Sequence, residues 1–213
     1  MTEGSFLTSA RAGYDTIAVP YAQLFAAELE AKPLDRSTLT AFAEMVGGAG
    51  PVVEVGSGPG RVAAYLAKQG LDVSGVDLSP EMVALARRTY PGLRFEEGSM
   101  TALDRADGAL AGLVAWYSII HIPPALLPEV FAEFRRVLAP GGRLLLAFQV
   151  GDESLHRTEG FGHTFSLTFH RLLPERITEL LERAGFVVDA QLVRAPDERE
   201  KVPQAHLLAH KPA

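Results

Sequence analysis

The chain has 213 residues, of which 47% are hydrophobic and 22% charged, with a formal net charge of −6 at pH 7 and no cysteine. This size and composition indicate one globular domain with a full core. The acidic balance argues against a nucleic-acid substrate, and the lack of cysteine excludes disulfides, thiolate zinc sites and cysteine nucleophiles. Because we find no signal peptide and no apolar run of the roughly 18 residues that span a membrane, we expect a cytoplasmic protein.

The first 46 residues are predicted to form a helical arm. Residues 1–9 are expected to be frayed. A helix is predicted over residues 12–29, where apolar side chains recur at helical spacing, and a second helix over residues 37–45. The glycines of residues 47–50 end this arm before the first strand.

The rest of the chain is organised around residues 52–61, which read Val-Val-Glu-Val-Gly-Ser-Gly-Pro-Gly-Arg. The β-branched residues suit a buried parallel strand. The glycines permit positive φ and close approach of a ligand to the backbone, and the helix that follows presents its free amides to this turn. A second strand, residues 72–77, ends on Asp77, 21 positions beyond Gly56. This is near the offset of about 20 for a carboxylate that binds ribose hydroxyls.

The residues around these glycines indicate which nucleoside is bound. A dinucleotide fingerprint needs glycine at its sixth position, where this chain has Arg61. Glu54 precedes the first glycine by two residues; its charge would repel a pyrophosphate but suits a cationic amino group. A nicotinamide dehydrogenase is therefore disfavoured.

Beyond Asp77 the chain continues to alternate helices and strands. Ser79 is predicted to cap a helix that begins at Pro80 and ends near Thr89. The later elements are expected to be strands over residues 93–97 and 112–117, a helix from the prolines at 123, 124 and 128 to residue 138, a strand over 142–150, a helix over 173–184, and strands over 186–194 and 206–210. This order implies a parallel sheet covered on both faces, with the last two strands as an edge hairpin.

Three segments resemble motifs of the class I S-adenosylmethionine (SAM) methyltransferases. Residues 54–60 are similar to the acid-x-Gly-x-Gly-x-Gly of motif I, residues 77–82 to an Asp-hydrophobic-Ser-x-x-Met segment, and residues 138–142 to the Leu-x-Pro-Gly-Gly entry to strand five. The resemblance covers about residues 50 to 190. It implies an α/β, three-layer Rossmann-like methyltransferase fold with a mostly parallel sheet and an antiparallel last strand.

The resemblance also implies the organisation of the domain. We expect a single methyltransferase domain over residues 1–213 that binds S-adenosyl-L-methionine and releases S-adenosyl-L-homocysteine. Its expected parts are a helical N-terminal arm or lid (1–46), a SAM-binding core (50–150), an acceptor-side flap (151–173), and a C-terminal helix with an edge hairpin (174–213).

Cofactor contacts are implied at the carboxyl ends of the strands. Glu54 would receive the methionine amino group, directly or through water, Asp77 would accept both ribose hydroxyls, and Leu78 would pack on adenine. The other implied contacts are Tyr14 and Tyr21 in the arm, Gly56, Ser57, Gly58 and Arg61 around the turn, Met82, Ser99 and Met100 near adenine, and Trp116 and Tyr117 near the methionine portion. A core position is the alternative for Met82, and the family often has Asp where this chain has Ser99.

A phenol, alcohol or ammonium acceptor must lose a proton, and histidine is the usual base near neutral pH. His121 follows strand four, where the family often has a histidine that is either structural or faces the active site. His163 and His170 are the other candidates, with a solvated loop residue as the alternative for each. They lie in the flap, where aromatic and polar residues alternate as in a strand. No metal is expected, because the acids and histidines lack the spacing of a metal site.

The predicted function is transfer of a methyl group from SAM to an oxygen or nitrogen atom of a small molecule, ahead of carbon, by in-line displacement under a closing lid. The alternatives are a methyltransferase of protein or peptide side chains and a non-catalytic SAM-binding regulatory protein. The expected partner is a small-molecule acceptor, with no nucleic acid and no membrane, and the protein is expected to be a monomer or homodimer.

Overall fold

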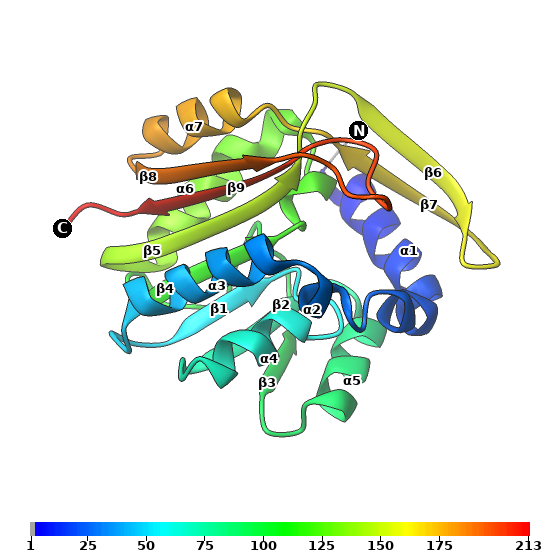
Figure 1. The fold of residues 1–213 in the computed structure, drawn as a ribbon, viewed down its shortest axis with the longest axis horizontal. Helices are drawn as coiled ribbons and strands as arrows, with labels where there is room; N and C mark the ends of the chain where they lie inside the picture. Colours follow the sequence, from blue (N-terminus) through cyan, green and yellow to red (C-terminus); the bar gives the residue numbers. More distant parts are fainter. Residues whose placement is uncertain (1–2) are drawn as a thin grey trace.

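The computed structural model describes residues 3–213, and its centre is a seven-stranded sheet in the order β3-β2-β1-β4-β5-β9-β8 (Figure 1). The strands are β1 (Val52–Val55), β2 (Val73–Asp77), β3 (Arg94–Glu97), β4 (Leu110–Trp116), β5 (Leu138–Gln149), β8 (Val187–Arg194) and β9 (Gln204–His210). Strands β1 to β5 pair in parallel, whereas β9 runs antiparallel to both β5 and β8. The predicted fold class and the antiparallel last strand are therefore confirmed.

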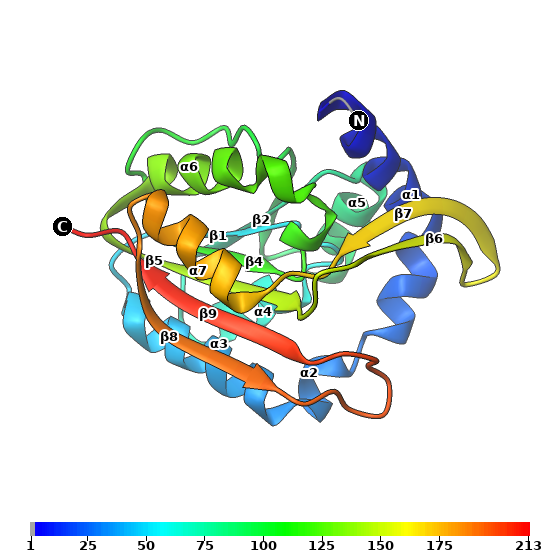
Figure 2. The same ribbon diagram turned by 90° about the horizontal axis from the view of Figure 1, so that it is seen from above.

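Helices cover both faces of this sheet (Figure 2). One face packs against α3 (Pro33–Val46), α4 (Arg61–Lys68) and α5 (Pro80–Thr89), and the other against α6 (Leu127–Val137) and α7 (Pro174–Arg183). Side chains of β1 alternate between the two cores: Val53 and Val55 face the α6 side and Val52 faces the α3 side. This two-sided burial explains why β1 is apolar at successive positions.

The turn after β1 needs glycine at the positions that the sequence indicated. Gly56, Gly58 and Gly60 have φ angles of 67°, 53° and 86°. A Cβ built on Gly56 would lie 2.3 Å from the Cβ of Ser118, so glycine alone lets this turn pass the loop that follows β4. That loop continues into the short 3-10 helices η1 (Ile119–His121) and η2 (Pro124–Leu126).

The first helix of the N-terminal arm begins and ends earlier than the sequence predicted. Helix α1 (Glu3–Leu24) includes residues 3–9, so their predicted fraying is wrong, while residues 1 and 2 lie outside the described part of the chain. The start of α1 is held by tertiary contact, since Phe6 is buried in the core. The helix ends at Leu24 rather than at residue 29, and a short helix α2 (Glu28–Ala31) follows.

The predicted flap is a two-stranded antiparallel hairpin of β6 (Ser154–Gly160) and β7 (His163–His170). Both views show it lying along α1, beyond the carboxyl end of β5 (Figures 1 and 2). The packing is close, because a Cβ on Gly13 of α1 would lie 2.7 Å from the side chain of Leu167 in β7. Arm and flap therefore form one cover. No helix within residues 3–213 has the length and apolarity needed to cross a membrane.

Candidate active site

A cavity of about 100 Å³ lies beneath α1, at the carboxyl ends of the parallel strands. Its walls come from α1 and from the segments that follow β1, β2, β3 and β4. The predicted site residues that line it are Tyr14, Tyr21, Gly56, Asp77, Leu78, Ser99, Met100, Trp116, Tyr117 and His121. The first turns of α1 add Phe6, Leu7, Ala10 and Arg11. Sequence reasoning missed them because it placed residues 1–9 in a frayed end and began the first helix at residue 12.

Asp77 is the carboxylate that faces this cavity. Its Oδ2 accepts the Gly58 N–H at 2.7 Å, and its Oδ1 accepts the Ser79 N–H at 2.8 Å. Burial raises the pKa of Asp77 to about 6. Because a carboxylate oxygen can accept more than one hydrogen bond, both oxygens keep capacity for the hydroxyls of a ligand. Asp77 thus holds the glycine-rich turn and remains able to bind a diol.

Glu54 is buried one strand away and does not line the cavity. Its Oε2 accepts the Ala63 N–H at 2.8 Å, which satisfies a free amide in the first turn of α4. Burial raises the pKa of Glu54 to about 8. Its contact with an amino group stays a prediction.

Other predicted cofactor residues also lie outside the cavity lining. Met82 is 1% exposed in the core, the alternative that the sequence left open for it. Ser57 is buried, with its Oγ in the space that a side chain at Gly75 would occupy. The backbone of Gly58 binds Asp77, and Arg61 is engaged with the arm. The contacts of these residues with a cofactor remain predictions.

His121 has a defined tautomer. Its Nδ1 lies 2.9 Å from the carbonyl oxygen of Thr168 in β7, and its Nε2 lies 2.7 Å from the hydroxyl of Tyr14. Because a carbonyl oxygen only accepts, Nδ1 carries the proton and Nε2 accepts from Tyr14. Burial lowers the pKa of His121 to about 4, so the ring is neutral near pH 7. Arm and flap together orient this histidine.

The structure does not bring the two flap histidines into the cavity. Leu167 and Phe169 point inward from β7, and the Phe169 ring lies 4.8 Å from that of His121. Strand alternation therefore turns His170 to the opposite face, where its Nδ1 contacts the hydroxyl of Ser154. His163 is exposed beside the hairpin turn. Across residues 3–213, no three His, Asp or Glu side chains converge as a metal site requires.

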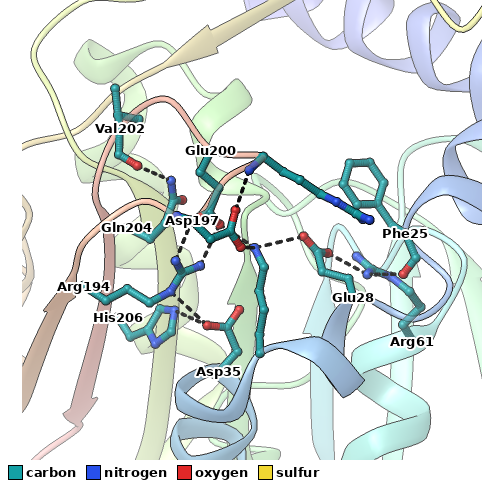
Figure 3. Close-up of polar contacts among 12 residues, drawn as sticks. Phe25, Glu28, Asp35, Arg61, Arg194, Asp197, Glu200, Val202, Gln204 and His206 are labelled. Atoms are coloured by element: carbon teal, nitrogen blue, oxygen red, sulfur yellow. Dashed lines mark hydrogen bonds and ion pairs between the residues drawn. The ribbon is translucent and has the colours of Figure 1, made fainter.

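A network of ion pairs joins the arm to the glycine-rich turn and to the loop between β8 and β9 (Figure 3). Arg61 donates from Nη1 to Glu28 Oε2 at 2.7 Å and to the carbonyl of Phe25 at 2.8 Å. Lys32 lies 3.3 Å from the other oxygen of Glu28 and also pairs with Glu200. The first turn of α4 is thereby tied to α2.

The network then reaches the sheet beside the cavity wall. Arg194 donates to Glu200 at 2.7 Å and to Asp35 at 3.1 Å, and Asp35 is 2% exposed. His206 Nε2 lies 3.8 Å from Asp35, and its ring lies 4.8 Å from that of Trp116. Because Trp116 lines the cavity, the network supports this wall from outside.

Known proteins with similar sequences are methyltransferases. Residues 52–142 match a family model described as a methyltransferase domain. Demethylmenaquinone methyltransferase of Chlorobaculum parvum is 31% identical over 155 residues, which cover 72% of this chain and 60% of that protein. Trans-aconitate 2-methyltransferase of Delftia acidovorans is 31% identical over 150 residues, covering 68% of this chain and 49% of the relative. The chain thus spans less than two thirds of the length of these relatives.

A solved structure shares the fold over the whole chain. The 1,6-didemethyltoxoflavin-N1-methyltransferase of Burkholderia thailandensis, with bound 1,6-didemethyltoxoflavin and S-adenosylhomocysteine, superposes with a TM-score of 0.73. The two chains are 20% identical, and the match covers 100% of this chain and 92% of the other. At that identity the likeness establishes the fold alone.

Proposed function

Because this chain belongs to the class I SAM-dependent methyltransferases, we propose that it transfers a methyl group from SAM to an oxygen or nitrogen atom of a small molecule. The observation that carries this proposal is the shared cavity of Asp77, Gly56 and His121 at the carboxyl ends of the strands. In open α/β sheets this edge is where ligands bind. This cavity suits a nucleoside cofactor beside an acceptor. Asp77 can bind a diol, the backbone at Gly56 is accessible to a ligand, and His121 supplies a neutral imidazole.

Each residue has a distinct task in this proposal. SAM, when bound, supplies a methyl group already activated on a sulfonium. Asp77 accepts the ribose hydroxyls, Leu78 and Met100 pack near adenine, and Glu54 receives the amino group directly or through water. Residues of the cavity therefore have mainly to place the acceptor and exclude water.

His121 is the proposed base, where the acceptor has a proton to lose. It is neutral near pH 7, so its Nε2 can take a proton, although its lowered pKa makes it a weaker base than free imidazole. Tyr14 donates to that nitrogen and keeps it directed at the cavity. An amine or a phenol that displaces the Tyr14 hydroxyl could deliver its proton there.

The arm acts as a lid over the cavity. The cavity measures about 100 Å³, whereas pockets for small molecules have roughly 300–1,000 Å³. Helix α1 must therefore move outward to admit cofactor and acceptor, and its return encloses them.

A small, partly apolar acceptor fits the lining. Aromatic rings of Tyr14, Tyr21, Trp116 and Tyr117 surround the part of the cavity beside His121. The two relatives are named for small acceptors, demethylmenaquinone and trans-aconitate. A net charge of −6 disfavours a nucleic acid as the acceptor, because it opposes binding of the phosphate backbone.

The test supplies SAM with a labelled methyl group to the purified protein and a cell extract separated by size. We expect label in the small-molecule fraction, where the product can be identified. Label in the protein fraction would instead support methylation of a protein side chain. No transfer, with SAM binding confirmed, would contradict the proposed catalysis and favour a regulatory SAM-binding protein.

A further inference from the structure

Asp15 makes a polar contact between α1 and the cofactor end of the cavity. It follows Tyr14, whose hydroxyl reaches His121 at the other end. Its Oδ1 accepts the hydroxyl proton of Ser79 at 2.6 Å and lies 3.4 Å from the Glu81 amide. Adjacent residues of the lid thus contact both halves of the site.

Ser79 connects Asp15 to Asp77. Its backbone N–H donates to Asp77 Oδ1 at 2.8 Å, and its Oγ accepts the Met82 N–H at 3.1 Å as the cap of α5. The side chain is buried, and its hydroxyl has a single proton. Because that proton goes to Asp15, the oxygen lone pairs remain for the Met82 amide, and both the hydroxyl and the backbone of Ser79 are fixed.

We propose that Asp15 is a positioning residue for the nucleoside: when the lid is docked, it holds Ser79 so that Asp77 presents its oxygens to the ribose. This inference rests on the proposed binding of SAM, and it adds that closing the lid completes the cofactor site rather than only covering it.

The charges around Asp77 give this role a second consequence. Asp15, Tyr14 and Tyr21 face it from α1 and Glu54 from β1. The amides of Leu78 and Ser79, in its own loop, and of Gly58, in the turn after β1, donate to it. The cation of α1 at the cavity, Arg11, pairs with Glu97 at 3.6 Å. Burial chiefly raises the pKa of Asp77, and the negative charge of Asp15 raises it further. Removing that charge should lower the pKa.

The experiment is calorimetric titration of the full chain with S-adenosylhomocysteine between pH 5 and 8. Asp15→Ala removes the hydrogen-bond acceptor and should weaken binding at pH 7.5 by about tenfold. Asp15→Asn keeps an acceptor oxygen, so its affinity at pH 7.5 should stay near that of the wild type. As the pH is lowered, binding by each protein should weaken when Asp77 takes up a proton. The pH at which half of the affinity is lost should be roughly half a unit lower in Asp15→Asn than in the wild type, because Asp77 then stays ionised to lower pH.

Glu81→Gln is the matched control, since it removes an exposed negative charge from the first turn of α5, next to Asp15. It should change neither the affinity at pH 7.5 nor the pH midpoint of binding. Circular dichroism checks that each variant is folded. Wild-type affinity of Asp15→Ala, or an unmoved midpoint in Asp15→Asn, would overturn the inference while Asp77→Ala still reports on the cofactor site. A wild-type protein that binds no S-adenosylhomocysteine would overturn the proposed function itself.

Discussion

Glu54 and Asp77 are buried carboxyl groups at the ends of two neighbouring strands. Burial raises their pKa values, to about 8 for Glu54 and about 6 for Asp77. In the free protein at pH 7, Glu54 is therefore largely protonated and Asp77 largely ionised. An ammonium group near Glu54 and a diol hydrogen-bonded to Asp77 both favour the ionised form of the carboxyl group. Binding of such a ligand should therefore lower both pKa values and release protons.

We predict release of up to about one proton when SAM binds at pH 7, mainly from Glu54. The measurement is calorimetry in buffers of different ionisation enthalpy. Glu54→Gln should abolish most of this release. Proton uptake on binding, or an unchanged release in Glu54→Gln, would contradict the role given to Glu54.

His121 is predicted to serve turnover rather than cofactor binding. Replacing it by Asn keeps a polar group that can face the Thr168 carbonyl but removes the nitrogen that can accept a proton. His121→Asn should therefore lower turnover by at least about tenfold and leave SAM affinity near the wild-type value. With the pKa of His121 at about 4, the activity of the wild type between pH 6 and 8 should not follow an imidazole titration. Full activity of the variant would mean that no base is needed or that it lies elsewhere.

At the scale of elements, the lid depends on the fit between α1 and β7. Gly13→Ala should reduce SAM affinity several-fold, because its Cβ would meet Leu167 at 2.7 Å and push the arm from the flap. Alanine would stabilise an isolated helix by about 1 kcal/mol, so lost affinity cannot come from a weaker helix. Gly92→Ala, in an exposed turn with free space, is the control. Equal affinities of both variants would contradict the docking of the arm on the flap.

The ion-pair network predicts that the loop between β8 and β9 stabilises the arm. Glu200→Gln removes the shared partner of Lys32 and Arg194, whose side chains are 13% and 10% exposed. It should lower the free energy of unfolding in urea by about 1–3 kcal/mol. Glu179→Gln, from an exposed pair with Arg176 in α7, should cost less than about 0.5 kcal/mol. Similar decreases in the free energy of unfolding in both variants would mean that the network stabilises the fold no more than an exposed ion pair does.

Elements with local signals could be predicted from the sequence, and those set by distant contacts could not. Ser79 and Pro80 begin α5 as predicted, because cap and first turn are adjacent in the chain. The start of α1 depends on the burial of Phe6 in the core, and no residue close to Phe6 in the sequence predicts that burial. The alternation in the flap predicted a strand, but the face that turns inward was set by packing against η1 and α1.

For the whole molecule, the sequence indicated which residues of the strand ends lie together better than which residues of the arm and flap join them. Gly56 and Asp77 end successive parallel strands, and the topology brings such ends to one edge. By contrast, Tyr14 and His121 are 107 positions apart, and their hydrogen bond depends on how the arm docks. For the same reason the sequence left His121, His163 and His170 as rival candidates, and the structure brings His121 alone of the three to the cavity.

The most direct measurement is a calorimetric titration of the wild type and Asp77→Ala with SAM. We expect the wild type to bind one SAM per chain. Loss of a charged acceptor of two hydroxyls should weaken binding in the variant at least about tenfold, or ~1.5–3 kcal/mol. A wild type that does not bind SAM, or equal affinity in the two proteins, would contradict the assignment of this cavity as the cofactor site.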